Sequence, residues 1–180
     1  MMNILLIEPF FAGSHEQWAE GLRQHSQHQI KLLTLPGRHW KWRMHGAAVT
    51  LAEQFLASGD KPDLILATDM LDLATFCGLA KCQEIPTVLY MHENQLAYPW
   101  SPTDDDVQLG RDNHYGFINY TSCLAADQVW FNSEYNLNSF LSELEKMLQR
   151  FPDYQDVQRV GDISQRSKVV PLGLDLRRFE

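Results

Sequence analysis

The sequence predicts an α/β protein with a Rossmann-like fold, in which helices wind on both sides of a mostly parallel sheet. First, five short aliphatic runs have no polar face, which is typical of strands that are covered on both sides. Second, segments with helical spacing of apolar side chains separate these runs, and such alternation produces βαβ crossovers. Third, 180 residues with 44% hydrophobic and 21% charged side chains suffice for one domain with its own core.

The predicted strands lie at residues 3–7, 30–35, 63–67, 87–91 and 128–131. The predicted helices between them lie at residues 15–24, 46–57, 72–81 and 115–126. Ser133 can cap a further helix at residues 134–150, which Pro152 ends. A short helix with a loop at residues 153–166 and a last strand at 168–173 complete the predicted fold.

The composition excludes several classes of protein. The formal net charge of −8, from 15 Lys and Arg against 23 Asp and Glu, means that any site for a polyanion must be local. The apolar start reaches Glu8 and Pro9 without a basic leader, which predicts a first strand and no signal peptide. No stretch approaches the roughly 20 apolar residues of a membrane span. We therefore expect a cytoplasmic protein with no membrane partner.

Neither the cysteines nor the clustered carboxylates predict a metal site. Cys77, Cys82 and Cys123 form no CxxC pair and lie among apolar residues, which predicts reduced thiols in the core. The three adjacent aspartates at residues 104–106 are typical of a solvated loop tip, because adjacent carboxylates seldom converge on one ion. We expect no metal.

The loop after the first strand contains Gly13, Ser14 and His15. Ligands of open α/β sheets bind beyond the carboxyl ends of the strands. A glycine there lets the backbone approach a ligand, and the free N–H groups of the next helix favour phosphate or a sugar oxygen. The GxGxxG and GxxxxGK[ST] patterns are missing, which disfavours a Rossmann dehydrogenase and a P-loop enzyme. The alternative is a turn glycine followed by a capping serine.

A basic loop with two tryptophans is predicted after the second strand. Arg38, Lys41 and Arg43 alternate there with Trp40 and Trp42. Cations bind phosphates, and indole faces stack on bases or sugars, so this pattern predicts ligand binding. The alternative is a tryptophan that packs a helix beside a solvated basic loop.

Four polar residues, His92, Glu93, Asn94 and Gln95, follow the fourth strand directly, and Tyr98 comes soon after. Hydrogen-bonding side chains straight after a buried strand predict recognition of substrate hydroxyls. His92 and Glu93 are also suited to proton transfer. The alternative for the histidine is a structural role.

Polar residues of the next two elements are weaker candidates. Tyr115, Asn119 and Ser122 recur at helical spacing, so they form a polar stripe that faces either the ligand crevice or solvent. Asn132 ends the fifth strand and could face the same crevice. Ser133 is better suited to helix capping.

These motifs, in this order, resemble the N-terminal domain of the tRNA-queuosine alpha-mannosyltransferases, which are retaining GT-B glycosyltransferases. The specific elements are Trp-x-Trp-Arg at residues 40–43 and His-Glu-Asn-Gln-Leu at residues 92–96. Residues 169–179 are similar to the hinge that joins the two domains of such enzymes. The resemblance implies an acceptor-side domain at residues 1–168 and the start of the hinge at 169–180, with the donor-binding domain outside this chain.

For the full-length enzyme, the resemblance implies transfer of mannose from GDP-mannose to queuosine in tRNA-Asp, with retention of configuration and no cofactor or metal. The implied partners are the tRNA, the nucleotide sugar and the donor domain, which would bind most of the nucleotide sugar. The isolated domain should transfer little or no sugar. His92 would meet the transferred sugar, while Gly13 and Ser14 would lie near the donor phosphate or the acceptor.

Two other functions remain open on the residues alone. One is a non-catalytic module of the same fold that binds a nucleotide or RNA. The other is a small hydrolase that uses His92 and Glu93, which the absence of a GxSxG motif disfavours. The candidates for catalysis are His92 and Glu93. The candidates for substrate binding are Gly13, Ser14, His15, Arg38, Trp40, Lys41, Trp42, Arg43, Asn94, Gln95, Tyr98, Tyr115, Asn119, Asn132 and Ser133.

Overall fold

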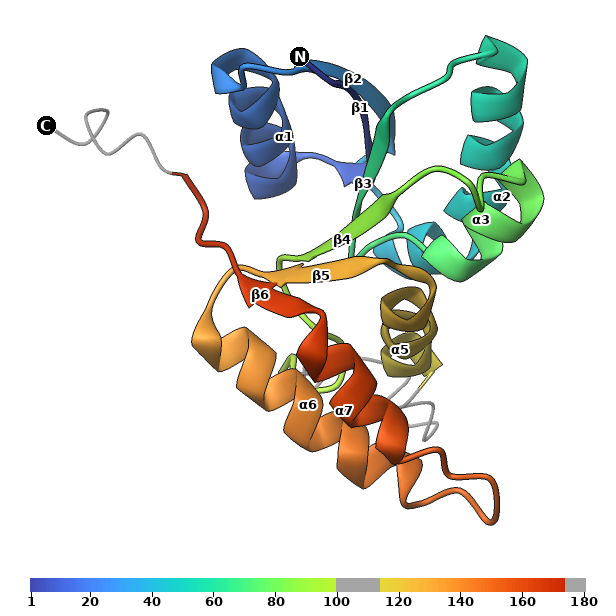
Figure 1. Cartoon of the computed structure of the whole chain (residues 1–180), viewed down its shortest axis with the longest axis vertical. Coiled ribbons are helices and arrows are strands. Elements are labelled where there is room, and N and C mark those ends of the chain that lie inside the picture. Colours follow the sequence, from blue (N-terminus) through green and yellow to red (C-terminus); the bar gives the residue numbers. More distant parts are fainter. Residues whose placement is uncertain (100–113, 174–180) are drawn as a thin grey trace, which may run out of the picture.

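The computed structural model of the chain describes residues 1–99 and 114–173. These residues form an α/β fold around a six-stranded, fully parallel sheet with the strand order β2-β1-β3-β4-β5-β6 (Figure 1). The strands are β1 (Asn3–Phe11), β2 (Gln29–Pro36), β3 (Leu64–Thr68), β4 (Thr87–Met91), β5 (Gln128–Phe131) and β6 (Ser167–Val169). The helices are α1 (Gly13–His25), α2 (Trp40–Ser58), α3 (Leu73–Ala80), α5 (His114–Ala125), α6 (Glu134–Leu148) and α7 (Gln158–Gln165).

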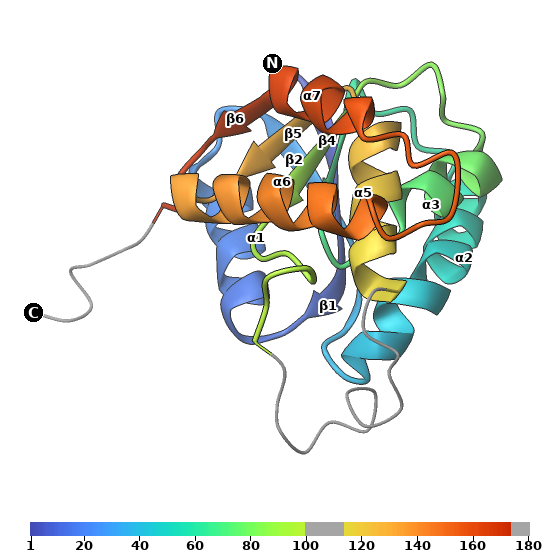
Figure 2. The same cartoon turned by 90° about the horizontal axis from the view of Figure 1, so that it is seen from below.

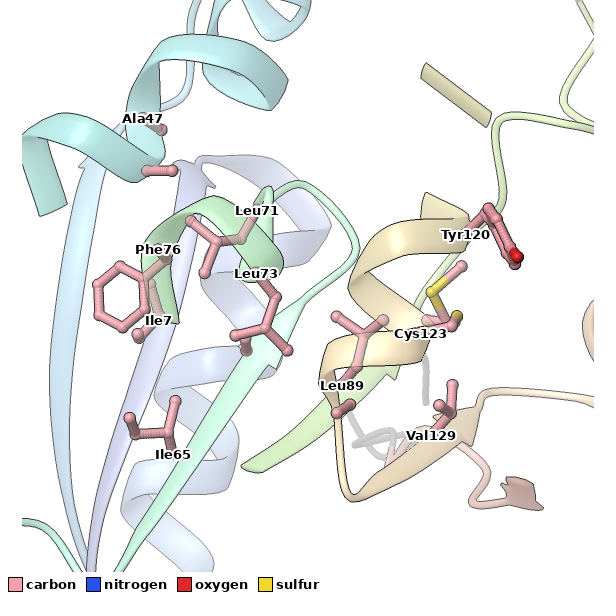
Figure 3. Packing of buried hydrophobic residues seen from close by; sticks show 14 of the residues in the cluster. Ile7, Ala47, Ile65, Leu71, Leu73, Phe76, Leu89, Tyr120, Cys123 and Val129 are labelled. Carbon is pink, nitrogen blue, oxygen red and sulfur yellow. The ribbon is translucent and has the colours of Figure 1, made fainter. Parts of the chain in front are cut away.

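The sheet separates two apolar layers. Side chains alternate along each strand, so Leu5 and Ile7 of β1 face one layer, while Ile4 and Leu6 face the other. The larger layer contains side chains of α2, α3, α5, α6 and α7, and the smaller one contains those of α1. Figure 2 shows α1 on the opposite side of the strands from α2 and α3. Figure 3 shows part of the larger layer, where Phe76 and neighbouring apolar side chains pack over the strands.

The predicted Rossmann-like fold is confirmed, and each predicted strand and helix is present near its expected position. The basic loop predicted between the strand at residues 30–35 and the helix at residues 46–57 ends at His39, so the prediction is wrong beyond it, because α2 already begins at Trp40. Three features explain why this helix start was not predicted. The N-cap residue His39 provides no side-chain cap and has a left-handed conformation (φ 55°). The first turn is basic instead of acidic, and Gly46 interrupts the helical pattern.

The first helix also starts earlier than expected. It begins at Gly13, so that Gly13, Ser14 and His15 form its first turn. The side chain of Ser14 does not cap the helix, because Ala12 occupies the N-cap position. Gly13 has a φ of 56°, which other residues rarely adopt, so the turn from β1 into α1 requires its conformational freedom.

Two further glycines bring the loops at the carboxyl ends of the strands together. A Cβ atom on Gly37 would collide with Ala12, so the loop after β2 packs directly on the loop after β1. A Cβ atom on Gly116 would collide with Leu96, so the loop after β4 packs directly on α5. Since all six strands are parallel, these loops lie at the same edge of the sheet, which we call the carboxyl edge.

The remaining expectations about the chain have different outcomes. Cys77, Cys82 and Cys123 are free thiols, as predicted, and Cys82 and Cys123 lie in the core, whereas Cys77 is only half-buried. No helix in residues 1–99 and 114–173 combines the length and apolar character needed to cross a membrane. The aspartates at 104–106 lie outside the described residues, as does the part of the predicted hinge at 174–180. The domain boundary at residue 168 stays a prediction.

Candidate functional site

A buried ion pair joins β1 to the first turn of α1. Glu8 is completely buried, and its Oε2 atom lies 2.9 Å from Nδ1 of His15. Its other oxygen, Oε1, accepts a hydrogen bond from the backbone N–H of Phe10 at 2.8 Å. A buried carboxylate is costly unless it is paired and hydrogen-bonded, and these contacts supply both. Glu8 was not among the residues that the sequence pointed to.

The environment of His15 keeps its ring charged. Burial alone lowers the pKa of His15, but the hydrogen bond from its ring to Glu8 and the negative charge of Glu8 outweigh this effect. The nearby carboxylates of Asp69 and Glu93 act in the same direction, and together these groups raise the pKa of His15 to about 9. At neutral pH the His15 side chain is therefore an imidazolium cation.

His92 lies beside this pair at the end of β4. The centroid of its ring is 4.7 Å from that of His15, 4.5 Å from that of Trp18 and 4.9 Å from that of Tyr90. The side chain is only 10% exposed, yet neither ring nitrogen makes a hydrogen bond. Most buried polar groups in proteins have a partner, so an unpartnered buried imidazole at a loop junction is suited to receive one from a ligand.

Asp69 connects the end of β3 to His92. It is fully buried, and its Oδ1 atom accepts a hydrogen bond from the backbone N–H of His92 at 2.7 Å. Nδ1 of His92 lies 3.3 Å from the same oxygen, but the two groups are not aligned as a hydrogen bond, and Oδ2 of Asp69 has no partner. Asp69 was not among the predicted site residues, although a carboxylate directly after a buried strand is a signal that the sequence contains.

Glu93 completes what we call the acid–imidazole cluster: Glu8, His15, Asp69, His92 and Glu93. Burial raises the pKa of the Glu93 carboxyl and the charge of Asp69 raises it further, while His15, the side chain of Gln95 and His92 lower it. Nε2 of Gln95 donates to Oε1 of Glu93 at 2.9 Å. The cluster thus places one cation among several carboxyl groups at the carboxyl edge, where proton transfer and binding of polar ligands are both chemically feasible.

Several predicted binding residues hold the loop after β4 in place. Oδ1 of Asn119 accepts from the backbone N–H of Gln95 at 2.9 Å, and its Nδ2 donates to the carbonyl of Asp69 at 3.0 Å. Asn94 donates to Oδ1 of Asn136 at 2.7 Å, and its own Oδ1 accepts from the backbone of Ala97. Asn94, Gln95 and Asn119 are all buried. Their contacts fix the loop, and direct contact with a substrate stays a prediction.

The residues after β5 have a similar role. Nδ2 of Asn132 donates to the carbonyl of His92 at 2.6 Å, so the loop after β5 helps to hold the backbone of His92 in place. Oγ of Ser133 accepts from the backbone N–H of Asn136 at 3.1 Å. Ser133 is therefore the N-cap of α6, as its sequence position suggested.

The two tryptophans at the start of α2 have different environments. Trp40 is half-buried and packs on Tyr115 with 5.1 Å between ring centroids, in a small apolar cluster that includes Met44 and Met70. Tyr115 is itself buried, which places it in this packing cluster. Trp42, in contrast, is 64% exposed. One tryptophan thus packs the helix, and the other is available at the surface.

The basic residues lie around Trp42 in what we call the basic segment, residues 38–43. Arg38 is exposed, and Nε of Arg43 donates to the carbonyl of Pro36 at 3.1 Å. Nζ of Lys41 lies 5.7 Å from the centroid of the Trp40 ring. Because Gly37 packs on the loop after β1, the basic segment and the first turn of α1 belong to neighbouring parts of the carboxyl edge. Gly13, Ser14 and Tyr98 are exposed.

Glu8, His15 and His92 offer the one arrangement in the described residues that could approach a single metal ion, since one ligand atom of each lies within 4.8 Å of the others. However, Nδ1 of His15 is already engaged by Glu8, and its raised pKa keeps the ring protonated. Metal binding requires a deprotonated imidazole. The arrangement therefore suits an ion pair better than a metal centre.

Comparison with known proteins agrees with the motifs at this edge. A family model described as tRNA-queuosine alpha-mannosyltransferase N-terminal matches residues 3–174. A tRNA-queuosine alpha-mannosyltransferase of Drosophila melanogaster is 35% identical over 182 residues, which cover 98% of this chain and 46% of that relative. The chain thus spans about half the length of the relative. The match to the family model extends over all six strands and the acid–imidazole cluster. The chain therefore belongs to the tRNA-queuosine alpha-mannosyltransferase family, as its N-terminal domain.

Proposed function

We propose that this chain is the acceptor-side domain of a retaining GT-B glycosyltransferase, which transfers mannose from GDP-mannose to queuosine in tRNA-Asp in the cytoplasm. The observation that carries the proposal is the buried, unpartnered imidazole of His92 beside the charged Glu8–His15 pair, in a chain of this family. A second domain, beyond the part of the relative that this chain covers, would bind most of the nucleotide sugar and close the cleft.

The chemistry of retaining transfer defines what the carboxyl edge must supply. The leaving diphosphate needs stabilisation of its charge, and the acceptor hydroxyl must be held on the same face of the sugar. The free N–H groups at the start of α1, together with the cationic His15, suit the first task. His92 would hydrogen-bond a sugar hydroxyl through a ring nitrogen, which would satisfy one of its two unpartnered atoms.

The acceptor would be held by the loop after β4 and by the basic segment. Glu93 and Tyr98 lie in that loop and would orient the acceptor, on the frame that Asn94, Gln95 and Asn119 fix. Phosphates of the tRNA would bind Arg38, Lys41 and Arg43, and Trp42 offers an indole face to a nucleobase. This local positive surface is what a chain with a net charge of −8 requires to bind RNA.

The proposal is tested by the nucleosides of tRNA. Mass analysis of tRNA from cells with and without the intact gene should show mannosylated queuosine only where the gene is present. The full-length protein should also transfer mannose from GDP-mannose to queuosine-containing tRNA in vitro, and His92→Ala should depress turnover much more than stability. Unchanged nucleosides, together with tRNA binding by the chain, would instead favour the non-catalytic RNA-binding module.

A further inference from the structure

The position of Glu8 in β1 is unusual for a buried strand. By the two-residue period of the strand, Glu8 continues the row of Ile4 and Leu6, which face the apolar layer under α1. An aliphatic residue would extend this layer, whereas a carboxylate must be paired there. The structure supplies one side-chain partner, His15, and one backbone partner, the N–H of Phe10. The carboxylate is therefore built into the layer together with His15.

The position of His15 is equally unusual. His15 is the third residue of α1, where the partial positive charge of the helix N-terminus disfavours a cation. The negative charge of Glu8 offsets this unfavourable interaction with the helix N-terminus. The carboxylates of Asp69 and Glu93, at the ends of β3 and β4, add further negative charge near His15. The ring of His92 is the other titratable group that packs on His15. A buried carboxylate and a cation at a helix start are each unfavourable alone. The 2.9 Å contact between Glu8 and His15 compensates the cost of both.

We propose that Glu8 is a positioning residue, which holds the His15 ring through Nδ1 and presents it as a cation whose Nε2–H donates to an anionic oxygen of the substrate. This inference rests on the proposed function. His15 is the group that would touch the substrate, and Glu8 acts only through it. The His15 side chain is 14% exposed, while the Glu8 side chain is inaccessible.

The first test follows the His15 ring in the chain by NMR titration, with the signal assigned from the spectrum of His15→Gln. In the unchanged chain the ring should titrate near pH 9. In Glu8→Gln, which preserves size and hydrogen bonding but removes the charge, the midpoint should fall by at least one pH unit. Glu20→Gln is the matched control. Glu20 lies in α1, as His15 does, but it is exposed and pairs with Arg23. An unchanged midpoint in Glu8→Gln would overturn the positioning role.

The second test measures binding of inorganic pyrophosphate to the full-length protein across the same pH range. Affinity of the unchanged protein should fall as pH rises through about 9, and in Glu8→Gln the fall should occur at lower pH. His15→Gln, which keeps a side chain that can hydrogen-bond Glu8, should bind pyrophosphate at least tenfold more weakly at pH 7. If His15→Gln binds as well as the unchanged protein, His15 does not contact an anion and the inference is wrong.

The two tests separate this inference from the proposed function. If the protein transfers no mannose but the His15 titration and pyrophosphate binding shift together, the positioning role stands and the assigned reaction is wrong. If transfer occurs but Glu8→Gln shifts neither measurement, the reaction stands and the positioning role is wrong. Should Glu8→Gln fail to fold, the affinities of His15→Gln and of the unchanged protein still decide whether the cation binds the ligand.

Discussion

The indole of Trp42 lies over Gly46, one helical turn later on α2. A Cβ atom on Gly46 would come within 2.6 Å of Cε2 and Cζ2 of the Trp42 ring. The glycine therefore lets the indole of Trp42, which is 64% exposed, lie against the helix surface. A glycine inside a helix costs about 1 kcal/mol relative to alanine, so this position is not explained by helix stability.

We expect Gly46→Ala to separate stability from RNA binding. The added methyl group displaces the indole, which is free to swing into solvent, so the free energy of unfolding should stay equal or rise by up to about 1 kcal/mol. Affinity for a tRNA anticodon stem-loop should fall severalfold, as it should for Trp42→Ala. Gly21→Ala in α1 is the matched control, because a Cβ atom on Gly21 would meet no neighbouring group within 4 Å. Equal RNA affinities for Gly46→Ala and Gly21→Ala would contradict a stacking role for Trp42.

Removal of both basic side chains next to Trp42 should weaken RNA binding in a salt-dependent way. Lys41→Ala with Arg43→Ala should lower the affinity for tRNA and reduce the slope of log affinity against log salt by up to about two, with little change in melting temperature. Lys146→Ala with Arg159→Ala removes the same charge from exposed ion pairs on α6 and α7. If both double variants lose the same affinity for tRNA, the loss results from the change in net charge, and the basic segment is not a specific binding surface for tRNA.

Asn119→Ala should be strongly destabilising. It leaves the buried N–H of Gln95 and the buried carbonyl of Asp69 without their partner, and each unsatisfied group costs about 1–3 kcal/mol. We expect a loss of about 2–4 kcal/mol in urea denaturation, with faster hydrogen exchange at the amide of Gln95. Asn138→Ala, an exposed position on α6, should change stability by less than about 0.5 kcal/mol. An equally small loss for Asn119→Ala would show that the loop after β4 does not depend on this side chain.

The ion pair of His15 should make stability depend on pH in a defined direction. The pKa of His15 is about 9 in the folded chain and about 6.5 when unfolded, so its contribution is complete below pH 6.5 and is lost as pH rises through 9. Between pH 6.5 and 9.5 the unchanged chain should lose on the order of 3 kcal/mol more stability than His15→Gln.

Urea denaturation across this pH range measures the difference between the two chains. His25→Gln is the control, because His25 is exposed on the same helix and contacts only the carbonyl of Gly21 among the contacts that the structure shows for it. Its pH dependence should follow that of the unchanged chain. A parallel pH dependence for His15→Gln and the unchanged chain would mean that His15 is not held as a cation.

Local patterns in the sequence were enough to determine the order of strands and helices and the class of fold. Aliphatic runs such as residues 87–91 indicate a strand that is buried on both faces, and helical spacing of apolar residues indicates a helix with one buried stripe. Both patterns can be recognised without knowledge of distant residues. The motif at residues 92–96 was also visible, because hydrogen-bonding side chains after a buried strand are conspicuous in any context. The early start of α2 escaped prediction, since its N-terminus has neither a capping side chain nor an acidic first turn.

Only the tertiary structure decided which polar residues form the acid–imidazole cluster and which merely support it. Glu8 and Asp69 look like isolated carboxylates in the sequence. Asp69 reaches His92 because β3 and β4 are neighbours in the sheet, and Glu8 reaches His15 because the turn at Gly13 leads from β1 directly into α1. Asn119 is a candidate for ligand binding in the sequence, and only the packing of α5 on the loop after β4 shows that it also bridges two backbones. Charge pairing and hydrogen-bond satisfaction depend on atoms within about 3 Å of each other, and a linear pattern carries no such distance.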